Sequence, residues 1–301
     1  MTSEQNHRYG ASLKHSDTEE TIDLWFYRPV GYRVALLGQR WGWSPNAITI
    51  VGLFLGAFAG VLFYPSDWRI NLLGMVFLVV ADICDSADGQ LARLTGKFSR
   101  IGRILDGACG DVWFISIYVC ICMRLTPSAG FWIWILAASG GYCHRVQAAL
   151  ADYYRNFHLF MVNGKRGSEL DDADLLLEQY KKVSWRVSPL KKLIQWIYLG
   201  YTRLQEKLTP NLQFFRKRIL QTNGDAVISP QLSELFRQQS LPLLKFTNIL
   251  TFNWRAITLF ISLMSGMPWL YFVVELTVFN AMLFYMRQKY EHIASTLLSK
   301  V

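Results

Sequence analysis

The chain has 301 residues, of which 52% are hydrophobic and 15% aromatic, and its formal net charge at pH 7 is +9. A soluble domain of this length could bury a large core, but here the apolar residues are gathered into long runs. A basic chain suggests nucleic acid or an anionic membrane surface as a partner, and the runs favour the membrane and argue against nucleic acid.

The N-terminal segment is polar for more than twenty residues, so we expect no cleavable signal peptide. Within it, residues 18–40 mix apolar and charged side chains. This pattern predicts an amphipathic helix that lies on the membrane surface directly before the first span.

Apolar runs further along the chain predict membrane-spanning helices, so the expected fold class is an all-α integral membrane protein with six transmembrane helices. The run 47–64 carries no charge and is nearly long enough to span at about 1.5 Å per residue. The last two runs carry one charge each, Arg255 and Glu275, which either pair inside the bundle or lie near substrate phosphates. The predicted spans are 46–65, 70–90, 104–123, 128–150, 247–266 and 268–287.

The placement of Lys and Arg predicts the orientation. Almost all of the 31 lysines and arginines lie in the two termini, in the loop after the second span, or in residues 145–246. Only Arg69 and Arg124 lie in the loops of the opposite side. We therefore expect a multi-pass protein of the cell inner membrane, with both termini and the active site on the cytoplasmic side.

A long connection, residues 155–246, separates the fourth and fifth spans. Helices are expected at 171–186, 189–208 and 210–221, and Thr209-Pro210 and Ser229-Pro230 are helix-start signals. This helical insertion either rests on the cytoplasmic leaflet or covers the site as a lid. The expected divisions are residues 1–45, 46–154, 155–246 and 247–301.

Five aspartates lie at the cytoplasmic ends of the second and third predicted spans. Carboxylates near apolar surroundings are costly and repel one another, so a fold keeps them where cations neutralise them or a site needs them. Mg²⁺ commonly bridges protein carboxylates and substrate phosphates. The five cysteines show no metal-type spacing and are expected to be buried apolar side chains. The aspartates are Asp82, Asp85, Asp88, Asp106 and Asp111.

The spacing of the residues around Asp85 and Asp88 supports a site for a metal ion and a phosphate. Asp85 and Asp88 are three residues apart and face the same way from one helix. Gly89 permits close backbone approach to a ligand, and Arg93 offers a fixed cation for a phosphate. Ala92 is small, and Gly102 opens the next helix.

The pattern Asp85-x2-Asp88-Gly89-x2-Ala92-Arg93-x8-Gly102-x3-Asp106 resembles the signature of the CDP-alcohol phosphotransferase family, and Pro45-Asn46-x2-Thr49 resembles its entry to the first span. The resemblance covers the six-span core and leaves residues 155–240 uncovered. It implies a homodimeric fold, two divalent ions (Mg²⁺ or Mn²⁺) held by four aspartates, and a CDP-linked donor. The implied donor-binding residues are Asn46, Thr49, Asp88, Gly89, Ala92, Arg93 and Gly102.

The fourth aspartate departs from the family pattern, because Gly110 stands where it is expected and Asp111 follows one residue later. Five residues place Asp106 and Asp111 about 140° apart on a regular helix. A one-residue π-bulge between Gly107 and Gly110 would realign them. We therefore predict this bulge, with Asp85, Asp88, Asp106 and Asp111 as metal ligands, Asp111 as the catalytic base, and Asp106 also in a catalytic role. Asp82 is expected to support the site.

The expected activity is transfer of a lipid-linked phosphate from a CDP-linked lipid to a polar alcohol, with release of CMP. Arg145 and Arg155 either bind an acceptor phosphate or anchor the membrane surface, and His144 is expected only to anchor. The phosphate interpretation favours inositol phosphate or another phosphorylated polyol as the acceptor. The alternatives are an amino-alcohol phosphotransferase with a lipid acceptor, a divalent-cation transporter, which Arg93 argues against, and a non-catalytic member of the family.

Overall fold

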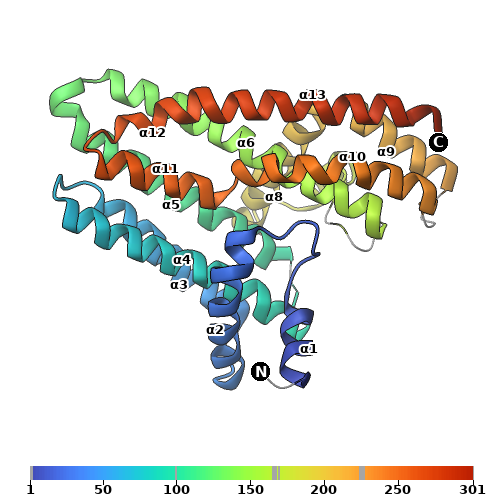
Figure 1. Ribbon diagram of the computed structural model, residues 1–301, viewed down its shortest axis with the longest axis horizontal. Coiled ribbons are helices and arrows are strands. Elements are labelled where there is room, and N and C mark those ends of the chain that lie inside the picture. The colour runs from blue at the N-terminus through green and yellow to red at the C-terminus, as the bar shows by residue number, and fades with distance from the viewer. Residues whose placement is uncertain (1–2, 99, 165–167, 169, 224–227, 301) are drawn as a thin grey trace. The chain divides into compact units, whose positions relative to one another are not determined.

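The computed structural model describes residues 3–98, 100–164, 168, 170–223 and 228–300, and within these ranges it contains helices and no strand (Figure 1). The expected all-α class is confirmed. The chain divides into two compact units, each described by itself below. The first comprises Met1–Tyr142 and Arg255–Leu276, and the second comprises Cys143–Trp254 and Thr277–Val301.

The first unit begins with α1 (Ser3–Ser12) and with a longer helix made of η1 (Asp23–Tyr27) and α2 (Arg28–Arg40). The longer helix has two faces, because Tyr32 and Ala35 are buried whereas Trp25 is 84% exposed. The expected amphipathic helix over residues 18–40 is therefore present. Its contact with a membrane surface stays a prediction.

Three helices form the centre of the first unit: α3 (Pro45–Leu62), α4 (Trp68–Thr95) and α5 (Arg100–Ala129). The Ser44 hydroxyl accepts a hydrogen bond from the Ala47 N–H at 3.2 Å, and Pro45 follows it, so α3 starts where its cap predicts. At Gly60, an added Cβ would lie 2.7 Å from the Ile117 backbone nitrogen. Only glycine lets α3 and α5 approach this closely.

Among the described residues, four helical stretches are long and apolar enough to cross a membrane, namely Pro45–Leu62, Trp68–Thr95, Ile104–Ala129 and Trp269–Lys300. They correspond to the first, second, third and sixth predicted spans. The last stretch comprises α12 (Trp269–Val274), η3 (Glu275–Phe279), α13 (Asn280–Leu297) and η4 (Leu298–Lys300).

The helices at the fourth and fifth predicted spans do not belong to this group. α6 (Trp132–Asn163) is long enough but too polar, and α11 (Phe252–Met264) has 13 residues, or about 20 Å. A hydrocarbon core is about 30 Å thick. The structure thus agrees with a multi-pass membrane protein and leaves the count of six spans as a prediction.

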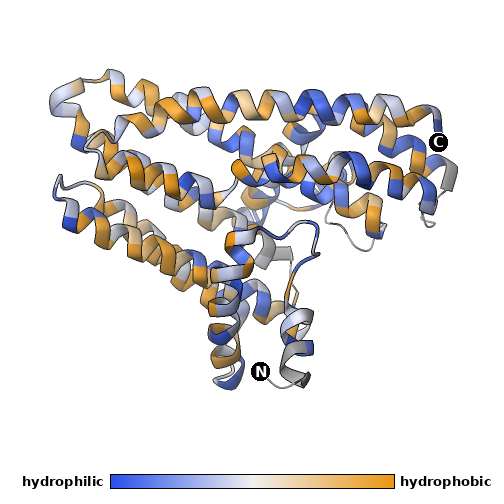
Figure 2. Cartoon of the chain, viewed as in Figure 1, coloured by the Kyte–Doolittle hydropathy of each residue, from blue (hydrophilic) through white to orange (hydrophobic). Residues whose placement is uncertain are grey.

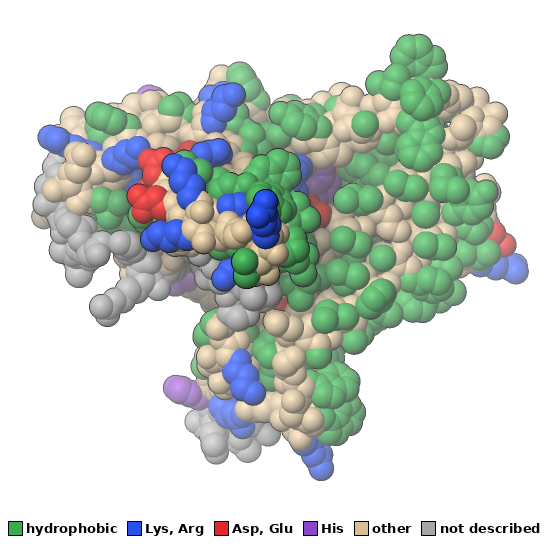
Figure 3. Space-filling view, turned by 180° about the vertical axis from the view of Figure 1, so that it is seen from behind, with side chains coloured by type: hydrophobic (Ala, Val, Ile, Leu, Met, Phe, Trp, Pro, Cys, Tyr) green, Lys and Arg blue, Asp and Glu red, His purple; other side chains and the backbone are tan. Residues whose placement is uncertain are grey.

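The surface supports membrane contact for the apolar helices. Phe54 of α3, Val76 of α4 and Ile115 of α5 are large apolar side chains that remain exposed. Figure 2 shows continuous apolar stretches along these helices, and Figure 3 shows hydrophobic side chains gathered over a broad part of the surface with few charged groups among them. A hydrocarbon environment satisfies such a surface, whereas water does not.

The second unit contains the long cytoplasmic insertion of the sequence prediction. Its helices are α7 (Ala173–Lys182), α8 (Pro189–Leu208), α9 (Pro210–Asn223) and α10 (Pro230–Ile249), so the expected helices are present and Pro210 and Pro230 begin helices as predicted. Phe157 of α6 packs against Phe215 and Phe236, with ring centroids 6.4 and 5.4 Å away. α9 and α10 therefore help to form the core of this unit.

Candidate functional site

The first part of the motif, from Asp85 to Arg93, lies on the last turns of α4, and Gly102 and Asp106 lie near the start of α5. Helix α4 runs without interruption through Asp85, Asp88 and Arg93 and ends at Gly96, whose φ of 67° is left-handed. A glycine accepts this conformation at no steric cost, so it ends the helix directly after the motif. Because the helix is uninterrupted and the two residues are three apart, Asp85 and Asp88 project from neighbouring positions near the end of α4.

Thr49 connects the motif to the other two central helices. Its hydroxyl donates a hydrogen bond to the buried carboxylate of Asp88, and its backbone carbonyl accepts a contact from the Cys109 thiol at 3.7 Å. One residue of α3 is thus tied to α4 and to α5. Thr49, which the resemblance assigned to donor binding, lies in direct contact with a predicted metal ligand.

Asp106 of α5 meets the aspartates of α4. Its carboxyl lies within hydrogen-bonding reach of Asp85, and the charges of Asp85 and Asp88 both act on it. Two carboxyl groups this close share either a proton or a cation. On the other side of Asp85, its charge acts on Asp82, which also lies near Arg28. The structure therefore brings Asp82, Asp85, Asp88 and Asp106 into one group, here called the acidic cluster.

Asp111 does not follow the prediction made for it. α5 is a regular α-helix from Arg100 to Ala129, with no π segment between Gly107 and Gly110. The predicted bulge is therefore wrong, and the two glycines meet no neighbouring atoms that would force one. On a regular helix Asp111 lies about 140° around from Asp106. Its assignment as fourth ligand and base stays a prediction that this geometry weakens.

Arg93 lies over the glycine of the motif. Its guanidinium nitrogen Nη2 is 3.4 Å from where a Cβ on Gly89 would stand. Nε donates to the Ser12 carbonyl at 2.5 Å, whereas Nη2 is buried without a hydrogen-bond partner among the described residues. A Cβ at position 89 would be in van der Waals contact with this guanidinium. Arg93 thus presents an unused donor beside the acidic cluster.

The remaining predicted donor-binding residues occupy the neighbouring helix ends. Asn46 lies half-buried in the first turn of α3, Ala92 half-buried one residue before Arg93, and Gly102 near the start of α5. Their contact with a nucleotide stays a prediction.

The chemistry of the acidic cluster fits a hard divalent ion. Among the described residues, no three His, Cys, Asp or Glu side chains converge tightly enough to hold a metal ion alone. Mg²⁺, however, is commonly bound through one or two carboxylates, with substrate phosphates and waters completing its octahedron. The pair formed by Asp85 and Asp106, with Asp88 beside it, offers oxygen ligands of this kind.

The residues predicted to bind the acceptor belong to the second unit. The Arg145 guanidinium lies 6.0 Å from the centre of the Tyr201 ring, and Arg155 Nη2 donates to the side-chain carbonyl of Asn248 at 2.6 Å. Both arginines and His144 are half-buried on α6. These contacts position the arginines within their unit, and an acceptor phosphate remains a prediction for them.

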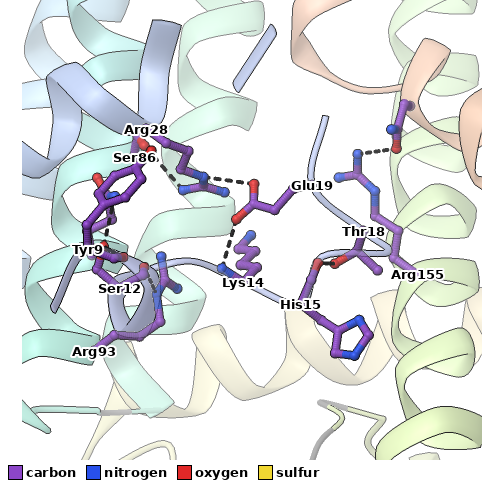
Figure 4. Close-up of polar contacts among 12 residues, drawn as sticks. Tyr9, Ser12, Lys14, His15, Thr18, Glu19, Arg28, Ser86, Arg93 and Arg155 are labelled. Carbon is purple, nitrogen blue, oxygen red and sulfur yellow. Dashed lines mark hydrogen bonds and ion pairs between the residues drawn. The ribbon is translucent and has the colours of Figure 1, made fainter. Parts of the chain in front are cut away.

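Several polar residues of the N-terminal segment were not singled out by the sequence. Arg28 Nε donates to Glu19 at 2.9 Å and Nη1 donates to Ser86 of α4 at 3.2 Å, and Ser12 contacts Arg93 (Figure 4). Burial, followed by the charge of Glu19, raises the pKa of Tyr9, so its hydroxyl stays neutral at physiological pH. No spacing rule marks these residues, because their partners lie far away along the chain.

Residues 43–154 match the family model described as CDP-alcohol phosphatidyltransferase, and this range includes the acidic cluster and Arg93. An archaetidylinositol phosphate synthase of Pyrococcus horikoshii is 38% identical over 77 residues, which cover 26% of this chain and 37% of that protein. No solved structure matches the chain.

Two further relatives widen the range of named activities. The bifunctional IPC transferase and DIPP synthase of Aquifex aeolicus is 29% identical over 98 residues, covering 33% of this chain and 22% of that protein. Cholinephosphotransferase 1 of Gallus gallus is 29% identical over 108 residues, covering 30% of this chain and 32% of that protein. The chain thus matches well under half the length of these curated relatives. The match and the motif geometry agree, and residues 43–154 are similar to the CDP-alcohol phosphatidyltransferase family.

Proposed function

We propose that the chain is a membrane-embedded phosphotransferase that moves a lipid-linked phosphate from a CDP-lipid to a phosphorylated polyol such as inositol phosphate. The observation that carries this proposal is the group formed by Asp85, Asp88 and Asp106 beside the unused donor of Arg93. A diphosphate needs cationic partners and metal-binding oxygens at one place, and this end of α4 offers both. A cation pathway has no use for an arginine there.

In the proposed reaction, the acceptor hydroxyl gives its proton to an aspartate, and its oxygen attacks the phosphorus attached to the lipid. A new P–O bond forms while the P–O bond to the CMP phosphate breaks, and CMP leaves with the electron pair. Arg93 holds the negative charge that gathers on the leaving phosphate. Asp85, Asp88 and Asp106 would hold two divalent ions, Mg²⁺ or Mn²⁺, which when bound supply electrostatic stabilisation of the transferring group.

Two aspartates, Asp111 and Asp82, are candidates for the base. Asp111 was expected in this role, but a regular α5 points it away from Asp106. Asp82 is the other carboxylate at this end, and the charge of Asp85 acts on it. Replacing each with Asn separates them, because loss of the base lowers the rate by orders of magnitude while donor binding survives.

The acceptor is inferred from two observations. One relative is named an archaetidylinositol phosphate synthase, and two arginines, Arg145 and Arg155, lie on α6. The relative named cholinephosphotransferase supports the second candidate, in which the polar amino alcohol arrives on CDP and a lipid is the acceptor. Further expectations are six spans, a homodimer, and an inner-membrane location with the site facing the cytoplasm.

The deciding experiment measures CMP release by the purified protein in lipid nanodiscs. A CDP-linked lipid is offered with inositol phosphate, glycerol 3-phosphate, inositol or serine, and in parallel CDP-choline is offered with a diacylglycerol. We expect release only with the CDP-linked lipid, fastest with a phosphorylated polyol, abolished by a chelator and restored by Mg²⁺ or Mn²⁺. Full activity in excess chelator would contradict the metal-dependent mechanism, and no release from any pair would contradict the function.

A further inference from the structure

The N-terminal segment contacts the predicted donor site directly. After α1 ends at Ser12, residues 13–20 run without helix before η1 begins. Ser12, Thr18 and Glu20 are buried, so the segment is packed in place. A tight turn, in which the Thr18 hydroxyl donates to the His15 carbonyl at 3.0 Å, fixes its course. We call residues 12–19 the strap.

The strap orients Arg93. The Ser12 carbonyl accepts from Arg93 Nε at 2.5 Å, and the Ser12 hydroxyl accepts from Gln90 Nε2 at 3.2 Å. With Nε held in this way, the guanidinium lies over Gly89 and its buried Nη2 is left unused among the described residues. The phosphate-binding geometry of Arg93 therefore depends on a residue 81 positions earlier in the chain.

A buried ion pair fixes the other end of the strap. Glu19 accepts from Arg28 Nε at 2.9 Å, and the Arg28 side chain is only 9% exposed. The second oxygen of the same carboxylate accepts from the backbone N–H of Lys14 at 2.8 Å. Because Glu19 is itself held by Arg28, the backbone of Lys14 is held at a defined place near α4.

Lys14 is the cation of the strap that faces the acidic cluster. Its charge acts on both Asp88 and Asp106. It is nevertheless exposed, and within the described part of the chain it forms no ion pair. The backbone of Lys14 is held, and its ammonium lies near enough for its charge to act on these carboxylates while bonding to neither. It is therefore available to bind an anion that enters between them.

We propose that Lys14 is a further donor-binding residue, whose ammonium contacts the diphosphate of the CDP-linked substrate, and that Ser12 and Glu19 are positioning residues for Arg93 and Lys14. This inference rests on the proposed function. It makes the strap part of the binding site, outside the range that matches the family model.

The test compares single substitutions in CMP release and in CDP binding. Lys14→Ala should raise the KM for the CDP-linked donor about tenfold or more, because a hydrogen bond between charged partners is lost, and should leave the acceptor KM unchanged. Lys14→Arg should restore most of the donor affinity. Arg8→Ala is the matched control, since it removes an equal charge from α1, where Arg8 is exposed and donates to Gln39 at 3.2 Å.

Calorimetric titration of CDP in the presence of Mg²⁺ tests the same contact without turnover, and Lys14→Ala should weaken CDP binding by a similar factor. If the wild type releases CMP and Lys14→Ala matches Arg8→Ala in donor KM and CDP affinity, only this inference is overturned. A lower donor KM in Lys14→Ala would overturn it too, since the strap would then obstruct the site. A wild type that binds CDP but transfers nothing overturns the proposed function and leaves the Lys14 contact measurable.

Discussion

The first unit contains two groups of buried charged side chains that differ in whether cations within the chain neutralise their carboxylates. Around Glu275, the carboxylate accepts from Arg255, from the Tyr271 hydroxyl at 2.6 Å and from the Tyr118 hydroxyl at 3.3 Å. Glu275 and Arg255 are 0% and 1% exposed. In the acidic cluster the carboxylates outnumber the cations that act on them, and Arg28 is already paired with Glu19.

Under the proposed function, this difference separates a structural group from the reacting site. A buried charge is tolerated when a partner of opposite sign and hydrogen bonds accompany it. At Glu275 the partner is Arg255, and Oε1 accepts three hydrogen bonds, whereas Oε2 has no hydrogen-bond partner among the described residues. The acidic cluster meets this requirement only if positive charge is supplied from outside the chain. The first group thus has its cation within the chain, whereas the proposed function supplies the second group with a divalent ion and an anionic substrate. Mutations in the acidic cluster should therefore lower activity and not stability, whereas mutations around Glu275 should lower stability and not activity.

The largest expected effect is a loss of activity in the variant Asp88→Asn. The amide keeps the shape and can still accept from the Thr49 hydroxyl, but it removes one ligand charge from the site. CMP release should fall at least about a thousandfold, because metal-held charge is worth several kcal/mol in phosphoryl transfer. The melting temperature should not fall, since repulsion with Asp85 is relieved.

The control for Asp88→Asn is the same substitution at the opposite end of α4. Asp67 caps this helix by accepting from the Arg69 N–H at 2.8 Å, and Asn caps equally well. Asp67→Asn should therefore leave both CMP release and the melting temperature unchanged. If Asp88→Asn keeps activity near that of the control, the acidic cluster is not the site.

The second-largest expected effect is a loss of stability in the variant Arg255→Met. This change leaves the Glu275 carboxylate buried without its cation, which should cost about 3–5 kcal/mol of unfolding free energy. Thermal unfolding in detergent measures the loss. The double variant with Glu275→Met should recover most of it, because removing both charges of a buried pair is often neutral. CMP release per folded molecule should stay near wild type, and a selective loss of turnover would instead place this pair in the reaction.

Local signals in the sequence predicted much of what the structure shows. Proline following a capping residue predicted the starts of α9 and α10, and the charges in two apolar runs suggested the pair Arg255–Glu275, which the structure confirms. These predictions succeed because a cap acts within one turn and an isolated charge in an apolar run requires a partner.

The unsuccessful and missing predictions have a different physical origin. The bulge in α5 was inferred from the chemistry expected of Asp111, whereas the local sequence lets a regular helix continue through Gly107 and Gly110. The strap contacts join Ser12 to Arg93 across 81 positions, and neither residue carries a pattern that reveals the other. Pairings of this kind depend on how the chain packs, which periodicity does not encode.

The smallest expected effect concerns the two tyrosines whose hydroxyls donate to Glu275, and it shows how much these hydrogen bonds stabilise the buried carboxylate. Tyr271→Phe removes a hydrogen bond of 2.6 Å to a charged acceptor, and Tyr118→Phe removes one of 3.3 Å to the same oxygen. Hydrogen bonds to charged groups contribute about 1.5–3 kcal/mol, so Tyr271→Phe should lower the unfolding free energy by an amount near the lower end of that range. Tyr118→Phe should cost less, because its bond is longer and weaker. Both rings remain and keep their mutual edge contact at 5.8 Å, so the comparison isolates the hydroxyl groups. Chemical denaturation of both variants in detergent gives the two differences. No loss in either variant would mean that the carboxylate is held by charge alone, and the role assigned to hydrogen bonding at Glu275 would then be wrong. Equal losses would contradict the ranking of the two hydrogen bonds by length.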